Sequence, residues 1–226
     1  MSDAPSSSYS DPFYDRLDAF AQELKKRWWL ALLILVAVMT TVVVVYQIRN
    51  RHPEAAGLAT FLSTQRKAED PSKAKDAWSA LVADQTLTPA IRARAGIELT
   101  QVLLLAGDTA SALPAAQAAV QQASQTSDVP VQLAAKLTLA AAQAQAGQAD
   151  DALSNYDAAE RAAGAKHAAQ QLEAILGGAR ILESQGKKDE ALARLEPLLS
   201  RADAGAENLL AVAKVRYWGL KHAPAK

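Results

Sequence analysis

Residues 146–153 read AGQADDAL, and the same pattern of a glycine followed five residues later by alanine and leucine occurs twice more. The related phrases are AGDTASAL at 106–113 and QGKKDEAL at 185–192. The glycines of the three phrases lie 40 and then 39 residues apart; they are Gly107, Gly147 and Gly186. Because each glycine separates two runs with helical character, this period predicts stacked helix pairs, the architecture of an α-solenoid.

Each position of the phrase has a physical reason. Glycine can end the first helix of a pair in the left-handed conformation that other residues avoid. Five residues later, Ala112, Ala152 and Ala191 provide small side chains that let two helices approach closely. Alanine also has the highest helix propensity and makes up roughly a fifth of the chain. We therefore expect an all-α fold.

The pattern G-x-x-x-x-A-L resembles the turn and second helix of the tetratricopeptide repeat. Three features differ, the first being that the usual closing proline is absent. Gly96, Lys136 and Ile175 stand where the repeat usually has tryptophan, and the period is about five or six residues longer. The resemblance implies helix pairs whose first helices form a concave face. If residues 53–84 form a further pair and 206–221 a last amphipathic helix, the solenoid has about four helix pairs and a C-terminal capping helix.

Residues 28–48 read WWLALLILVAVMTTVVVVYQI and contain no charged side chain. As a helix they would be about 30 Å long, which matches the hydrocarbon core of a bilayer. Trp28 and Trp29 at one end and Tyr46 at the other are placed like interfacial aromatic residues. A cleaved signal peptide fits less well, because 27 residues precede this run and no small-residue cleavage site follows it. We expect a single transmembrane helix that anchors the chain.

The segment before the span divides into two parts. Residues 1–10 are small and polar, which predicts a disordered tail. Residues 11–27 predict an amphipathic juxtamembrane helix, with apolar side chains at helical spacing. These are Phe13, Leu17, Phe20 and Leu24.

The charges that flank the span predict its orientation. Four basic residues precede it and two follow closely; they are Arg16, Lys25, Lys26 and Arg27, then Arg49 and Arg51. The side with more basic residues usually faces the cytoplasm. We therefore expect the N-terminus in the cytoplasm and residues 53–226 on the other side of the membrane.

The composition and the titratable residues point away from catalysis. The chain has 24 basic and 24 acidic residues, of which 18 and 19 belong to residues 53–226, so a nucleic-acid footprint is not expected. There is no cysteine, and His52, His167 and His222 are scattered. Adjacent acids at 150–151 and 189–190 begin second helices, where they favour the helix dipole. No catalytic or metal-ligand spacing occurs, so we expect no enzyme, cofactor or metal.

Tetratricopeptide arrays bind partners on the face formed by their first helices, and this resemblance implies the positions of a groove. The candidate groove residues are Arg94, Ile97, Gln101, Leu104, Leu137, Ala141, Glu173, Leu176, Arg180 and Glu183. The lysine and asparagine with which some such domains hold a C-terminal carboxylate are replaced by Ile97 and Gln101. The groove is therefore expected to suit an extended, partly apolar polypeptide. The alternative is that these residues only line a scaffold.

A neutral, alanine-rich repeat domain behind one N-terminal span resembles the YfgM family of ancillary subunits of the bacterial SecYEG translocon. The resemblance implies a bacterial inner-membrane protein with a periplasmic repeat domain. It also implies protein partners, namely translocon subunits, periplasmic chaperones or unfolded clients, and no small-molecule substrate. A different possibility is a structural scaffold or assembly factor of another cell-envelope complex, such as a secretion, pilus or outer-membrane assembly machine.

Overall fold

The computed structural model describes residues 37–42, 53–68, 71–202 and 205–222, in two compact units, Met1–His52 and Pro53–Lys226. In the first unit only residues 37–42 are described, and they are helical. The predicted tail 1–10, the helix 11–27, the anchor residues Trp28, Trp29 and Tyr46, and the rest of the span 28–48 lie outside the described residues. Within the described residues, no helix has the length and apolar character needed to cross a bilayer.

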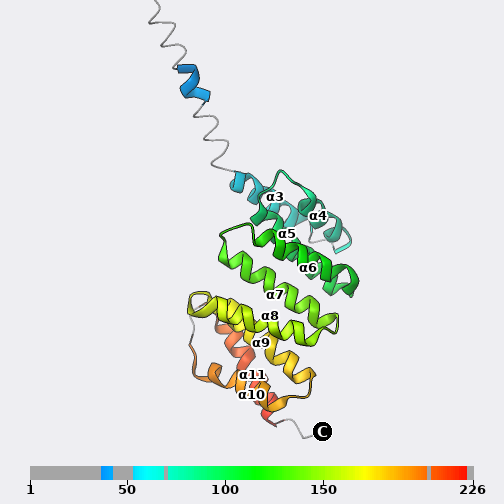
Figure 1. Cartoon of the computed structure of the whole chain (residues 1–226), viewed down its shortest axis with the longest axis vertical. Helices are drawn as coiled ribbons and strands as arrows, with labels where there is room; N and C mark the ends of the chain where they lie inside the picture. The colour runs from blue at the N-terminus through cyan, green and yellow to red at the C-terminus, as the bar shows by residue number, and fades with distance from the viewer. Residues whose placement is uncertain (1–36, 43–52, 69–70, 203–204, 223–226) are drawn as a thin grey trace, which may run out of the picture. The chain divides into compact units, whose positions relative to one another are not determined.

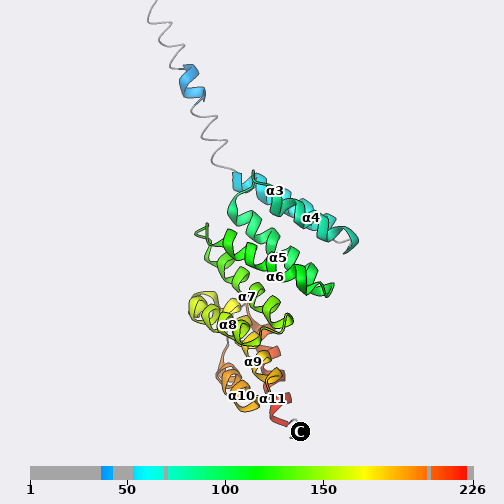
Figure 2. The same ribbon diagram turned by 45° about the vertical axis from the view of Figure 1, so that its right-hand side comes forward.

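The second unit is all-helical over its described residues, as the sequence predicts. Nine α-helices and two short 3₁₀ helices follow one another in chain order, and Figures 1 and 2 show them stacked along the unit. The helices are α3 (Pro53–Lys67), α4 (Pro71–Ala83), α5 (Pro89–Leu105), α6 (Thr109–Ala123), α7 (Val129–Gln145), α8 (Ala149–Ala163), η1 (Gly164–His167), α9 (Ala168–Ser184), α10 (Lys188–Leu195), η2 (Glu196–Ser200) and α11 (Glu207–His222).

The helices pack in a repeating order. The odd-numbered helices α3, α5, α7, α9 and α11 each contact the next odd-numbered helix. The even-numbered helices α4, α6, α8 and α10 pack on the odd-numbered helices before and after them, but not to a comparable extent on one another. We call the odd-numbered helices the first layer and the even-numbered helices the second layer. Only the first layer is therefore continuous along the solenoid-like stack, and we call the side of it that faces away from the second layer its exposed side.

The glycines at the turns have the predicted left-handed conformation, with φ of 73° at Gly107, 78° at Gly147 and 76° at Gly186. At the middle turn the N–H of Gln148 donates to the carbonyl oxygen of Gln143 at 2.9 Å. Equivalent hydrogen bonds close the other two turns. They satisfy carbonyl groups that would otherwise be unpaired at the helix end. The turns thereby return the chain directly into the second layer.

Small residues bring the two layers together. Ala112, Ala152 and Ala191 are fully buried, as the repeat pattern predicts. At Gly96 of α5, an added Cβ would lie only 2.9 Å from the Cβ of Ala119 in α6. This distance is closer than two carbon atoms normally approach, so only glycine allows these helices to pack as they do.

Two neighbouring glycines of α9 make room for side chains from the two second-layer helices that pack on it. A Cβ at Gly177 would fall 2.3 Å from the ring of Tyr156 in α8, and one at Gly178 would fall 2.5 Å from the guanidinium of Arg194 in α10. Arg194 passes α9 here and donates to Asp157 at 2.5 Å and to Glu160 of α8 at 2.6 Å. The glycine pair therefore serves side-chain passage as well as close helix packing.

The last pair differs from the others. Its second-layer helix α10 has eight residues, whereas α6 and α8 have 15 each. Pro197 is the second residue after α10, and because proline has no N–H and crowds the preceding turn, the chain continues as the 3₁₀ helix η2. The final helix α11 buries Leu210, Ala213 and Tyr217 on one face, as an amphipathic helix does.

The buried alanine of the repeat provides a test of the packing. Ala152→Leu adds three carbon atoms to a fully buried position of α8 and should lower the free energy of unfolding by about 1–3 kcal/mol. Ala55→Leu makes the same change at an exposed position of α3 and should cost much less. Thermal melts of residues 53–226 measure both. Equal losses at the two positions would contradict the observed packing register.

Candidate functional site

A cavity of about 310 Å³ opens on the exposed side of the first layer. Its lining comes from four successive first-layer helices, α3, α5, α7 and α9, and from no other element. The lining residues are Phe61, Arg94, Ile97, Glu98, Pro130, Val131, Ala134 and Gln170. Five of these eight side chains are apolar, so the cavity offers a mainly apolar surface with a small number of polar groups at fixed positions. We call it the first-layer cavity.

An ion pair fixes the cationic side of this cavity. Arg94 of α5 donates to the carboxylate of Asp128 at 2.8 Å. Asp128 also caps α7, because its other oxygen accepts the N–H of Val131 at 3.2 Å. Asp128 therefore satisfies a free helix amide and holds the arginine at the same time. The positive charge of Arg94 is thus largely neutralised.

The acidic side is different. Glu98 lies one helical turn after Arg94 in the cavity lining and is half-buried. Burial raises the pKa of the Glu98 carboxyl above its ordinary value, because its charged form loses hydration. No ion pair to Glu98 occurs among the described residues. The cavity therefore contains a partly desolvated carboxylate without a matching cation.

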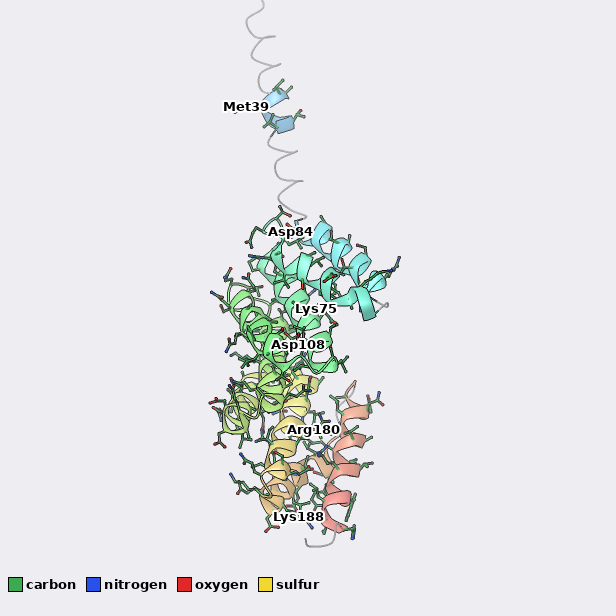
Figure 3. All side chains as sticks on the ribbon, turned by 90° about the vertical axis from the view of Figure 1, so that its right-hand side faces the viewer. Met39, Lys75, Asp84, Asp108, Arg180 and Lys188 are labelled. Atoms are coloured by element: carbon green, nitrogen blue, oxygen red, sulfur yellow. The ribbon has the colours of Figure 1, made fainter. Side chains whose placement is uncertain are left out.

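A second acid lies further along the first layer, on α9. Part of the Glu173 side chain is exposed to solvent. Neighbouring protein atoms still desolvate its carboxyl, which raises the pKa despite the opposing effect of Arg180. The Tyr156 ring reaches the same place beneath Gly177. Burial and the charge of Glu173 raise the pKa of the Tyr156 hydroxyl. Arg180 is exposed on α9 (Figure 3). The first layer is thus apolar and acidic at two separate positions.

Apart from Glu173, the structure divides the candidate groove residues into four groups. Arg94 and Ile97 line the first-layer cavity. Gln101 and Arg180 are exposed, and Leu104 and Ala141 are half-buried. Glu183 forms a bidentate ion pair with Arg216 of α11, so its charge is already used within the fold.

Leu137 and Leu176 form the fourth group and are a correction to the predicted groove. Both are 3% exposed and belong to core clusters, Leu137 with residues of α8 and α9 and Leu176 with residues of α10 and α11. The reason is that each first-layer helix is covered on two sides, by the second layer and by its neighbours. These two leucines reach the second layer and are not available to a ligand, whereas Ile97, which has the same register and is 8% exposed, also reaches the lining of the first-layer cavity.

Sequence reasoning missed most of the cavity. Phe61 comes from α3 and Gln170 from α9, so more than a hundred residues separate two side chains of one cavity. A signal was present at Glu98, a charged residue directly between Ile97 and Leu99 in an otherwise apolar run. Such a residue is expected at the border between a buried and a solvated helix face.

The two acidic pairs noted in the sequence lie at helix N-termini. Asp150 and Asp151 lie in the first turn of α8, and Asp189 and Glu190 lie in the first turn of α10, where negative charge is favourable. Among the described residues, no group of three or more histidine or acidic side chains could hold a metal ion. Comparison of the chain with protein-family models, curated proteins and solved structures finds no significant match.

The raised pKa of Glu98 predicts a dependence of stability on pH. The folded chain keeps the Glu98 proton to a higher pH than the unfolded chain does, so stability from the protonated form is lost as pH rises through the raised pKa. Glu98→Gln resembles the protonated form at every pH. It should raise the melting temperature at pH 7 by roughly 1–3 °C, because partly exposed charges contribute under about 1 kcal/mol.

At pH 4, where Glu98 itself is largely protonated, the same substitution should have almost no effect. Glu190→Gln, at an exposed position in the first turn of α10, is the matched control and should not increase stability at either pH. Melting curves of residues 53–226 at both pH values measure this. A Glu98→Gln variant that melts lower at pH 7 would show that the charge is compensated in the fold.

Proposed function

We propose that the chain is a membrane-anchored, tetratricopeptide-like protein-interaction module whose first layer binds an extended polypeptide segment. The observation that carries this proposal is the first-layer cavity, because four successive helices contribute to it. A surface built from parallel helices in this way suits a segment that runs across them and places one side chain in the cavity. The four pairs α3/α4, α5/α6, α7/α8 and α9/α10 then correspond to four degenerate repeats.

The chemistry of the surface indicates which polypeptides it binds. Phe61, Ile97 and Ala134 favour an apolar side chain in the cavity. Desolvation raises the pKa of the Glu98 and Glu173 carboxyls, so a cationic side chain of a ligand would stabilise the charged form of each. A segment that combines apolar side chains with lysine or arginine fits both features. Unfolded stretches of exported proteins have this composition in many places.

The predicted span at 28–48 gives this surface a place to act. A tethered module meets partners in its own membrane at a raised effective concentration, so moderate affinity is sufficient. The resemblance to the YfgM family supports a more specific version, in which the chain is an ancillary subunit of the Sec translocon in the bacterial inner membrane. Its periplasmic domain would link the translocon to chaperones or bind emerging polypeptides.

Site-specific photocrosslinking in native membranes tests this function. A photoreactive residue replaces Gln170, which lines the first-layer cavity, or Gln121, which is exposed on α6 of the second layer. The proposal expects polypeptide adducts from position 170 and few from position 121. Identification of the adducts separates translocon subunits and clients from the components of another envelope complex. Stronger crosslinking from position 121 would place recognition on the second layer.

A substitution in the cavity should reduce this capture. Ala134→Arg fills part of the first-layer cavity and adds a positive charge beside Glu98, so the yield of adducts from position 170 should fall at least about fivefold. Ala193→Arg introduces the same side chain at an exposed position of α10 and should leave the yield unchanged. Far-ultraviolet circular dichroism checks that both variants keep their helicity. Equal yields from the two variants would contradict a binding role for the cavity.

The proposed location predicts a topology. Because four basic residues precede the span and two follow it closely, residues 53–226 should lie in the periplasm. Alkaline phosphatase fused after Lys226 should therefore be active, since this enzyme needs the oxidising periplasm to form its disulfides. A reporter that works only in the cytoplasm provides the matched control at the same position. Activity of the cytoplasmic reporter alone would reverse the orientation.

A further inference from the structure

The last helix, α11, exposes an apolar stripe that the earlier first-layer helices bury. Val212, Val215 and Trp218 are 45%, 74% and 49% exposed. Together with Asn208, Ala211, Gly219 and His222, which are also exposed, they follow helical spacing along one face. Figure 3 shows α11 at the edge of the stack. No other described residues pack over this face, and a polar face would be expected on a helix that simply ends a solenoid.

The neighbouring helix α9 shows what such a face is built to contact. The two helices can be aligned by a shift of 36 residues. In this alignment, the α9 residues that face the preceding pair correspond to the α11 residues that face α9 and α10. The matched residues are Ala174 with Leu210, Gly177 with Ala213 and Ile181 with Tyr217. The same shift places Leu176, Ala179 and Leu182, which are 3%, 0% and 5% exposed, on Val212, Val215 and Trp218.

In α9 this face is covered by the following helix. Leu176 and Ala179 share a core cluster with Leu195 of α10 and Leu198 of η2. The exposed face of α11 is thus the position at which the stack receives a further helix. What is missing on α11 is one helix with a complementary apolar seam.

The stripe on α11 is complementary to itself. Counted from Val215, six of the exposed residues form three pairs that lie at equal distances on either side and agree in apolar or polar character. The pairs are Val212 with Trp218, Ala211 with Gly219, and Asn208 with His222. In an antiparallel pair centred on Val215, the large Trp218 therefore meets the smaller apolar Val212, small residues meet small ones and polar residues meet at the ends. The positions 208, 212, 215, 219 and 222 also have the alternating spacing of a coiled-coil seam.

Local contacts prepare this seam. The Trp218 ring stacks on His222, with 5.8 Å between centroids and 15° between planes, and the Lys221 ammonium lies 5.2 Å from its centroid. The tryptophan is therefore held along the helix before any partner binds, which lowers the entropy lost on association. An added Cβ at Gly219 would meet no atom within 4 Å, so the surface is open there to a second backbone.

The charges favour the same arrangement. Glu207 lies in the first turn of α11, and Lys221 and His222 lie in its last turn. Antiparallel pairing brings the acidic end of one helix to the basic end of the other and also aligns the two helix dipoles favourably. A parallel pair would place like charges together at both ends.

We propose that α11 is a homodimerisation helix, which pairs antiparallel with α11 of a second copy of this chain about a two-fold axis at Val215. The interface is isologous, as in most homodimers. It leaves the first-layer cavity on α3, α5, α7 and α9 outside the contact, so each dimer presents two such cavities. This inference does not depend on the nature of the ligand.

The absence of cysteine from the whole chain allows a direct test. Single-cysteine variants of the full-length protein are oxidised in native membranes. Val215→Cys faces itself across the axis and should give a disulfide-linked homodimer. Val212→Cys alone should give little, because its two copies lie about 9 Å apart along the helix axis. Co-expression of Val212→Cys with Trp218→Cys should restore the crosslink, because these positions face each other.

A charge substitution supplies the second arm. Val215→Glu places two carboxylates opposite each other and should weaken association of the full-length protein in detergent at least about tenfold, measured by light scattering with size-exclusion chromatography. Val215 is largely exposed, so the fold should be unaffected. Leu105→Glu makes the same kind of change at the C-terminal end of α5, where the leucine is 89% exposed, and should leave association unchanged.

Several results would overturn the proposal. A Val215→Cys adduct to a protein of different mass would show that a helix of another protein covers α11. Equal crosslinking from Val212→Cys alone and from Val215→Cys would exclude the antiparallel register. A monomeric native protein, or a Val215→Glu variant that remains fully associated, would show that α11 does not mediate dimerisation.

Discussion

The close approach of helices through glycine and alanine is the constraint on which the structure depends. Gly96 and Ala119 bring α5 and α6 together at a distance that no larger pair of residues allows. The fully buried Ala112, Ala152 and Ala191 provide small side chains on the second-layer helices of three pairs. Alanine loses no side-chain entropy on burial, but it also buries little area per residue. The stack therefore depends on many shallow contacts, and each depends on the next pair being in place.

This packing determines where the chain can bind. Since small residues are used between the layers, larger and polar side chains such as Phe61, Arg94 and Glu98 remain on the exposed side of the first layer. Asp128 is involved in both tasks, because it caps α7 and also holds Arg94. The geometry of the cavity is thus determined by the helix ends as well as by the helix faces. A module of this kind needs no moving part to offer a defined surface.

The sequence predicted those features that depend on local chemistry. The turn at Gly147 and the buried Ala152 follow from one short phrase, because left-handed backbone and close packing each require a small residue. The sequence did not predict which first-layer residues face a ligand. Leu137 fits the repeat spacing but is buried, since spacing alone does not distinguish the two covered sides of a helix from its open side. Phe61 joins the cavity only through the stacking of four helices.

Arg194 of α10 links two helices of the second layer. Successive first-layer helices contact one another, whereas successive second-layer helices do not do so to a comparable extent. Arg194 crosses below Gly178 and ties α10 to α8 through Asp157 and Glu160, with its side chain only 15% exposed. The corresponding link between α4 and α6 is the longer and exposed pair of Lys75 and Asp108 at 3.4 Å, which water and salt weaken. Side chains therefore tie α8 and α10 together more firmly than they tie α4 and α6.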